Sequence, residues 1–239
     1  SPSTQEFNPY YGGGNEEYYM NLIADAMEPY LSASGIQFTR NTPDMTAASS
    51  IAASNAGNYD LHLALHSNAV GSSQQPTVRG IDVYYYPTSV NGKRFADIAA
   101  NNLQLIYPLP GMVKTVPTTR LGEVARVRAP GVLIELGYHD NPLDADWIRN
   151  NINNIAENLV LSLTEYFGIP FNMPQPIQVG YVSTEGSNLN IRSRPDISAP
   201  IIGKIPNGSE IVIYNRLPEW DLVGYSGVIG YSSNRYISA

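Results

Sequence analysis

Helical and strand-like patterns alternate along the first two thirds of the chain, and this alternation limits the fold more than any other feature of the sequence. Apolar residues recur at helical spacing over 15–33, 46–56, 92–106 and 143–167, the last being one long helix or two that abut. Strand-like runs lie at 36–40, 60–66, 80–86 and 131–135. Such alternation is typical of an α/β fold, so we predict a mostly parallel open sheet flanked by helices.

The pattern changes near residue 170. Gly168 is followed by Pro170, Pro174 and Pro176, which a helix could not cross, and this spacing predicts a short, fairly stiff linker. Beyond it, short apolar runs alternate with turn residues over roughly 60 positions, as is typical of a small all-β barrel. The expected organisation is a first domain over 1–168, a linker over 169–178 and a second domain over 179–239.

Two of the chain's three histidines lie in one strand-like run, Asp-Leu-His-Leu-Ala-Leu-His-Ser-Asn. Successive side chains of a strand point to opposite faces, so His62 and His66 share one face, and His66 stands where the strand ends. The third, His139, follows a buried apolar run that closes with Glu135. A lone histidine is more often an ordinary hydrogen-bonded residue than a ligand, but a buried carboxylate is costly unless it is paired, metal-bound or catalytic. These strand ends predict a metal site.

Composition excludes several classes of function. The net charge is −7 and the 14 lysines and arginines are scattered, which argues against a nucleic-acid partner. The absence of cysteine excludes disulfides, a thiol nucleophile and cysteine-type zinc sites, and it fits a protein that works outside the cell. No run of about 18 apolar residues occurs, so we expect no membrane span, and we expect no signal peptide in the sequence as given.

The C-terminal region resembles the bacterial SH3 domains that accompany cell-wall enzymes. The resemblance is carried by Leu-Asn-Ile-Arg-Ser-Arg-Pro over 189–195, Ile-Gly-Lys-Ile-Pro-Asn-Gly over 202–208, Trp220, and Gly-Tyr at 230–231. In so small a domain large side chains are needed for the core, so core packing is favoured over ligand contact for Trp220. The resemblance implies that this domain binds peptidoglycan.

The first domain resembles the zinc-dependent N-acetylmuramoyl-L-alanine amidases of the third amidase type over most of residues 1–168. The matching features are Glu16, which opens a helix after a glycine-rich turn, His66 in Leu-His-Ser-Asn-Ala, and Glu135 in Ala-Pro-Gly-Val-Leu-Ile-Glu-Leu-Gly-Tyr. The resemblance implies that Glu16 and His66 are zinc ligands and that Glu135 is the catalytic carboxylate. Glu17 could replace Glu16 by register, but the helical spacing favours Glu16.

The sequence departs from that family at the first metal ligand. The family has a histidine in an Asp-Pro-Gly-His turn, whereas this chain reads Ser-Pro-Ser-Thr-Gln. Three explanations compete. His139 could replace the missing histidine, or an oxygen of Thr4 or Gln5, or water, could take its place. Alternatively, the enzyme could have lost its metal. We favour His139, because two histidines and a carboxylate leave a fourth zinc position open for water. His62 lies about 13 Å from His66 along an extended strand, so both cannot bind one ion unless the strand bends sharply.

The resemblance implies hydrolysis of the amide bond between N-acetylmuramic acid and L-alanine in peptidoglycan. Glu135 would take a proton from a zinc-activated water and pass it to the leaving amine. Asn68 and Arg126 are the candidates for substrate binding, although a solvated surface role is the more common one for an arginine. Expected localisation is extracellular and associated with the cell wall. Two other hypotheses about function stay open. The chain could be an inactive wall-binding protein on an amidase scaffold, or a zinc peptidase that acts on the stem peptide.

Overall fold

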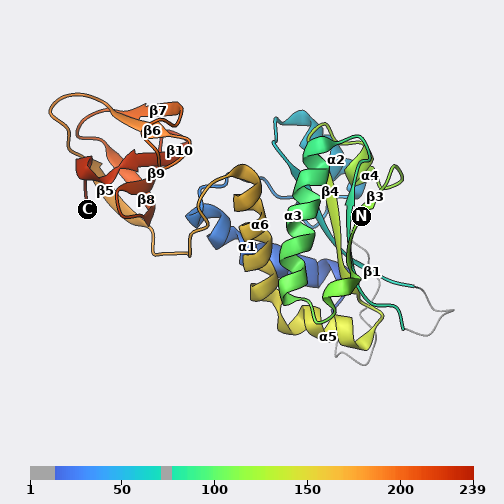
Figure 1. Ribbon diagram of the computed structural model, residues 1–239. Coiled ribbons are helices and arrows are strands. Elements are labelled where there is room, and N and C mark those ends of the chain that lie inside the picture. Colours follow the sequence, from blue (N-terminus) through green and yellow to red (C-terminus); the bar gives the residue numbers. More distant parts are fainter. Residues whose placement is uncertain (1–13, 71–76) are drawn as a thin grey trace. The chain divides into compact units, whose positions relative to one another are not determined.

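The computed structural model describes residues 14–70 and 77–239, which form two compact units. The first unit holds the described residues up to Met27 together with 40–166, and the second holds 28–39 and 167–239. Helix α1 (Glu16–Ala33) therefore contributes to both units (Figure 1). The finer domain limits stay a prediction.

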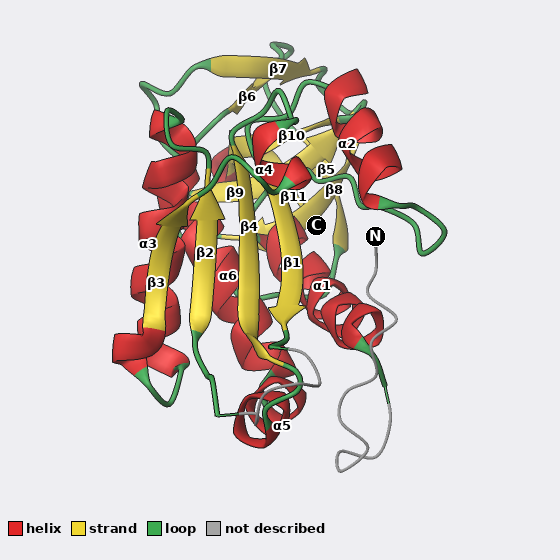
Figure 2. Cartoon of the chain, turned by 90° about the vertical axis from the view of Figure 1, so that its right-hand side faces the viewer, coloured by secondary structure: helices red, strands yellow, loops and turns green. Residues whose placement is uncertain are grey.

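Within the described residues, four strands form the sheet of the first unit in the order β1-β4-β2-β3 (Figure 2). They are β1 (His62–Asn68), β2 (Ile81–Tyr85), β3 (Val113–Pro117) and β4 (Gly131–Tyr138). Strand β1 pairs with β4, and β2 with β3, in parallel, whereas β2 and β4 are antiparallel. The predicted α/β fold with a mostly parallel sheet is confirmed.

Helices lie on both faces of this sheet, with α4 on the face that carries Ala64 and Leu133. After α1 they are, in chain order, α2 (Ala47–Ala56), α3 (Val90–Ile106), α4 (Gly122–Ala125), α5 (Pro142–Asn150) and α6 (Ile152–Phe167), with a 3-10 turn, η2 (Pro110–Met112). In Figure 2, α3 and α6 lie behind the sheet. Val83 and Ile134 of the sheet, Phe95 of α3 and Leu159 of α6 are fully buried. Because side chains alternate along a strand, the neighbouring positions of β2 and β4 face the other side, where polar groups can reach solvent.

One expected strand is absent. Residues 36–40 carry a strand-like apolar pattern but have no regular secondary structure in the structure. A strand needs a hydrogen-bonding neighbour, and this segment is instead held by α1: the Ile36 N–H bonds to the Leu31 carbonyl at 2.9 Å, and Arg40 donates to the Asn21 carbonyl at 3.2 Å. The strand prediction was therefore wrong at this point.

The second unit contains an all-β region, as predicted. Its strands are β5 (Gln178–Val182), β6 (Leu189–Arg192), β7 (Ile201–Ile205), β8 (Glu210–Arg216), β9 (Trp220–Tyr225), β10 (Val228–Ser233) and β11 (Ile237–Ser238), with a 3-10 turn, η3 (Asn234–Tyr236). The strand pairs are antiparallel, in the order β11-β5-β8-β9-β10-β6-β7. Ser226 and Gly227 both have positive φ and form the two-residue turn between β9 and β10.

Trp220 does not lie in the core of this region. Aliphatic side chains fill that core, among them Leu189, Ile205 and Val223. Trp220 is only half-buried and lines a surface pocket together with Arg192. The preference for Trp220 as a core residue was wrong, because the aliphatic cluster, with Tyr225 packed against it, fills the core without the indole.

Candidate functional site

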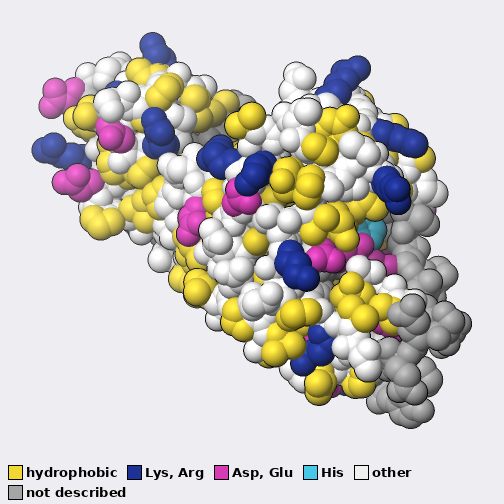
Figure 3. All heavy atoms as spheres, turned by 45° about the vertical axis from the view of Figure 1, so that its right-hand side comes forward, with side chains coloured by type: hydrophobic (Ala, Val, Ile, Leu, Met, Phe, Trp, Pro, Cys, Tyr) yellow, Lys and Arg dark blue, Asp and Glu magenta, His cyan; other side chains and the backbone are white. Residues whose placement is uncertain are grey.

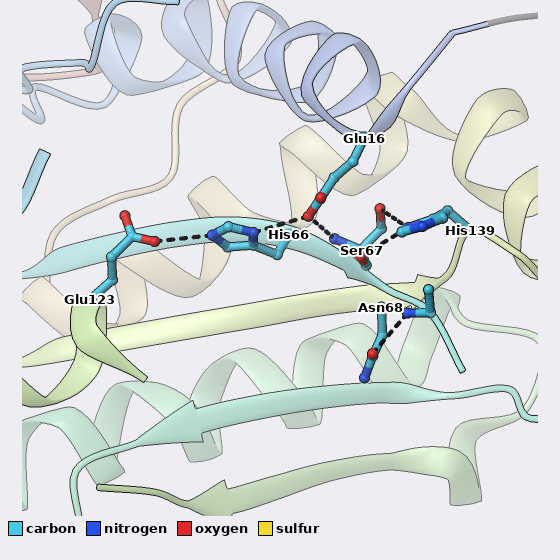
Figure 4. A network of polar contacts seen from close by, with 7 residues as sticks. Glu16, His66, Ser67, Asn68, Glu123 and His139 are labelled. Carbon is cyan, nitrogen blue, oxygen red and sulfur yellow. Dashed lines mark hydrogen bonds and ion pairs between the residues drawn. The ribbon is translucent and has the colours of Figure 1, made fainter. Parts of the chain in front are cut away.

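A carboxylate and an imidazole meet where helix α1 begins beside strand β1. Glu16 is buried, and its Oε1 lies 2.9 Å from His66 Nδ1 (Figure 4). The same oxygen accepts a hydrogen bond from the Ser67 backbone N–H at 3.0 Å. The structure thus brings Glu16, and not its neighbour Glu17, to His66.

A second carboxylate, from Glu123 of helix α4, meets the other side of the same imidazole. Its Oε2 lies 3.1 Å from His66 Nε2, so both ring nitrogens face a carboxylate. Its Oε1 lies 3.8 Å from His62 Nε2, which is too long for a hydrogen bond, and His62 Nδ1 lies 3.1 Å from the Ser54 hydroxyl. Sequence patterns missed Glu123, because a helix of four residues has no apolar period to mark it.

These contacts shift the pKa values of the cluster. Burial alone would lower the pKa of His66, but Glu123 and Glu16 raise it to about 10. Burial alone would raise the pKa of both carboxyls. The hydrogen bond with His66 and that from the Ser67 N–H hold the pKa of Glu16 below its usual range, and His62, followed by His66, lowers the pKa of Glu123 to about 2. Without metal, the cluster at neutral pH is therefore an imidazolium ion between two carboxylates.

His139 reaches the same region through Ser67. The histidine is buried, and its Nδ1 lies 2.9 Å from both the hydroxyl and the carbonyl oxygen of Ser67. Ser67 thus stands between His139 and Glu16, as Figure 4 shows. In the part of the chain that the structure describes, no three His, Asp or Glu side chains are arranged to hold a metal ion. Thr4 and Gln5, the alternative ligands, lie outside the described residues.

Glu135 lies beside His66, on the face of the sheet that also carries α4. The pairing register places His66 of β1, Glu135 of β4 and Asp82 of β2 in one row across three strands. Glu135 Oε2 is buried and has no hydrogen-bond partner among the residues that the structure describes. Burial raises the pKa of Glu135 to about 7; His66 opposes the rise, and the charges of Glu16 and Asp82 add to it. Figure 3 shows acidic side chains gathered beside a histidine on the surface of the molecule.

The raised pKa of Glu135 makes a prediction for the metal-free protein. The group binds its proton more tightly when folded than when unfolded, so stability falls as the pH rises from about 4.5 to about 7. Glu135→Gln removes this penalty. We expect the variant to match the wild type at pH 4 and to exceed it by about 3 kcal/mol at pH 8, as measured by urea unfolding in the presence of a chelator. Equal stability of the variant and the wild type at pH 8 would contradict a raised pKa of Glu135 in the folded protein.

The two predicted substrate-binding residues lie at the ends of the elements that carry His66 and Glu123. Asn68 ends β1, and its side-chain oxygen accepts a hydrogen bond from the Ala69 N–H at 2.8 Å. Arg126 caps the C-terminal end of α4 and is exposed. Their contact with substrate stays a prediction. Arg79, which precedes β2, pairs with the buried Asp144 at 2.7 Å.

Comparison with known families gives matches to both parts of the chain. The model of the N-acetylmuramoyl-L-alanine amidase family matches residues 6–165, and the model of a bacterial SH3 domain matches residues 187–238. No curated protein sequence matches the chain.

Solved structures with a similar fold include the following three proteins. The amidase AmiC2 of Nostoc punctiforme is 22% identical, with a TM-score of 0.57, over 66% of this chain and 87% of that one. The catalytic domain of the CD27L endolysin, which targets Clostridia Difficile, is 24% identical, with a TM-score of 0.52, over 63% and 84%. The catalytic domain of CwlV, an amidase from Bacillus (Paenibacillus) polymyxa, is 18% identical, with a TM-score of 0.55, over 65% and 86%. At these identities the likeness shows the fold.

Proposed function

The chain belongs to the N-acetylmuramoyl-L-alanine amidase family, whose members cleave the amide bond between N-acetylmuramic acid and L-alanine in peptidoglycan, and we propose that this chain does so with zinc. Glu16 and His66 are the proposed ligands, with His139 as the third. Glu135 is the proposed catalytic carboxylate. The observation that supports this assignment best is the register that sets His66 and Glu135 side by side on neighbouring strands.

Two donor atoms at the site suit a zinc ion. Carboxylate oxygen and imidazole nitrogen both bind zinc, and two such donors of a tetrahedral site lie about 3.3 Å apart. Glu16 Oε1 and His66 Nδ1 are 2.9 Å apart, so they need to separate only slightly. His139 would have to exchange its contact with Ser67 for the metal.

Glu135 is suited to move the proton during hydrolysis. Bound zinc would polarise the scissile carbonyl and acidify a water molecule. No residue within 14–70 or 77–239 forms a hydrogen bond with Glu135 Oε2, so this oxygen is suited to accept that water's proton and to deliver it to the leaving amine. Asn68 at the end of β1 and Arg126 at the end of α4 are proposed to contact the glycan or the stem peptide.

The second unit is proposed to bind peptidoglycan and to keep the enzyme at the cell wall, outside the cell. Its match to a bacterial SH3 domain supports this. The pocket lined by Trp220, Arg192 and Tyr236 offers aromatic and charged groups for such contact. No helix among the described residues is long and apolar enough to cross a membrane.

Metal content and peptide release test the proposal together. Purified wild-type protein and Glu17→Gln, a matched control beside the proposed ligand, should each bind one zinc ion and release peptides with a new N-terminal alanine from purified cell walls. Glu16→Gln, His66→Ala and His139→Ala should lose both zinc and release. Zinc can be counted by plasma mass spectrometry.

The other outcomes identify the alternatives. Zinc retained in His139→Ala would move the third ligand to Thr4, Gln5 or water. A wild-type protein that binds no zinc and releases nothing after zinc addition would be an inactive wall-binding protein. Cuts inside the stem peptide would indicate a zinc peptidase.

A further inference from the structure

We propose that Glu123 is a positioning residue that holds the His66 imidazole in the orientation and tautomer required for metal binding through Nδ1. The inference rests on the proposed role of His66 as a zinc ligand. It follows from the contact between Glu123 Oε2 and His66 Nε2, at 3.1 Å, on the side of the ring away from Glu16.

The fold places Glu123 over the histidines by docking helix α4 on the sheet. Val124 packs against Ala64 of β1 and Leu133 of β4 in a small buried cluster. Ala64 lies between His62 and His66 on the same face of β1, so its small side chain leaves room for the helix.

A glycine in β4 permits this close approach. A Cβ atom at Gly131 would lie 2.7 Å from the Glu123 carbonyl oxygen and 2.9 Å from that of Val124. Such distances do not occur between unstrained atoms, and the contacts are with backbone, which cannot move aside easily. The backbone of α4 therefore packs directly on Gly131, and this contact does not depend on the Glu123 side chain.

The imidazole of His66 is held from two sides. A histidine that binds a metal through one nitrogen commonly donates its other N–H to a carboxylate, which fixes the ring and its tautomer. Nδ1 of His66 faces Glu16, the proposed fellow ligand, and Nε2 faces Glu123. With the proton kept on Nε2 by Glu123, Nδ1 presents its lone pair to the metal.

His62 lies behind Glu123, at a distance too long for a hydrogen bond. The second carboxylate oxygen, Oε1, lies 3.8 Å from His62 Nε2, and Ser54 of α2 holds the other nitrogen of that ring at 3.1 Å. This gives His62 a part in the site without making it a ligand. Within the described residues, a hydrogen bond joins Ser54 to His62, and two more join Glu123, His66 and Glu16; the 3.8 Å between His62 Nε2 and Glu123 Oε1 separates the two groups.

Zinc affinity of the full-length protein tests the inference. Dissociation constants would be measured by competition with a chromophoric chelator for the wild type, Glu123→Ala, Glu123→Gln, His62→Ala and a control, Glu157→Gln on α6. We expect Glu123→Ala to bind zinc about 10- to 100-fold more weakly. Glu123→Gln should lose less, since its amide oxygen can still accept the Nε2 proton. His62→Ala should have a smaller effect than Glu123→Ala, and the control none.

A second readout separates positioning from general stability. The visible spectrum of the Co²⁺-substituted protein reports the ligand geometry, and we expect it to change in Glu123→Ala but not in Glu157→Gln. Wild-type affinity and spectrum in Glu123→Ala would overturn the inference, even if its metal-free form unfolded more easily. If Glu123→Ala behaved like the wild type while His66→Ala lost zinc, the proposed function would be supported and only the role of Glu123 would be refuted. If the wild type bound no zinc, both would fail.

Discussion

Glu135→Gln is expected to lower peptide release by about 10²- to 10⁴-fold while one zinc ion stays bound, because general acid–base catalysis contributes about this much to a hydrolytic rate. Glutamine keeps the size of the side chain, and its Oε1 can still accept a hydrogen bond, but it cannot carry a proton away from water to the amine. The measurement is the rate of new N-terminal alanine formed from purified walls, with zinc counted in the same samples.

Asp82→Asn is the matched control for this variant. Asp82 lies directly across from Glu135 on the neighbouring strand, and the substitution likewise exchanges a carboxylate for its amide. We expect it to remain within about tenfold of the wild-type rate, since a group that only adds charge nearby contributes less than the proton carrier itself. An equal loss in both variants would contradict a special role for Glu135 and would assign the chemistry to the carboxylate pair.

The alignment of His66 with Glu135 was only partly predictable from the sequence. Each residue ends an apolar run, and strand ends are where open α/β sheets place functional side chains, so both were recognisable. That β1 and β4 are neighbours, in a register that sets His66 opposite Glu135, depends on the order of strands in the sheet. Strand order is a property of long-range packing, which no local pattern encodes.

Strand β3 and Glu123 were missed for the same physical reason. Lys114 and Pro117 interrupt the apolar pattern of β3, and its strand conformation comes from pairing with β2. Glu123 lies in a helix of one turn whose place is fixed by Val124 and Gly131 through contacts with the sheet. Segments this short take their structure from tertiary contacts and not from their own propensity.

The position of His139 depends on the way β4 ends. Gly137 has a φ of +103°, which a residue with a side chain rarely adopts, and the register with β1 shifts between His66 and Asn68. The chain then returns to β1, where the His139 N–H bonds to the Asn68 carbonyl at 2.8 Å. The sequence predicted His139 as the third donor because zinc needs a third protein ligand. The backbone turn that directs the His139 ring toward Ser67 could not be predicted from the sequence.

Asp144 joins the segments that support this end of the sheet. Its carboxylate is fully buried in the first turn of α5. Oδ1 accepts hydrogen bonds from Arg79 Nε at 2.7 Å and from the Tyr107 hydroxyl at 2.6 Å, and Oδ2 accepts from the Gly80 and Tyr138 N–H groups at 3.2 and 3.1 Å. One side chain thus ties the entry to β2, the end of α3 and the end of β4 together.

Asp144→Ala is accordingly expected to lower the free energy of unfolding by about 3–5 kcal/mol. The substitution leaves the Arg79 guanidinium without its buried partner, and it leaves the Tyr107 hydroxyl and the Gly80 and Tyr138 N–H groups without an acceptor. Urea unfolding of the metal-free protein measures the loss. Asp146→Ala is the control on the same helix: its side chain is 57% exposed and its contact with Arg149 is 3.8 Å long, so a change within about 0.5 kcal/mol is expected. A loss below 1 kcal/mol in Asp144→Ala would mean that water replaces the carboxylate, and that the end of β4, and with it His139, is held by the surrounding apolar packing instead.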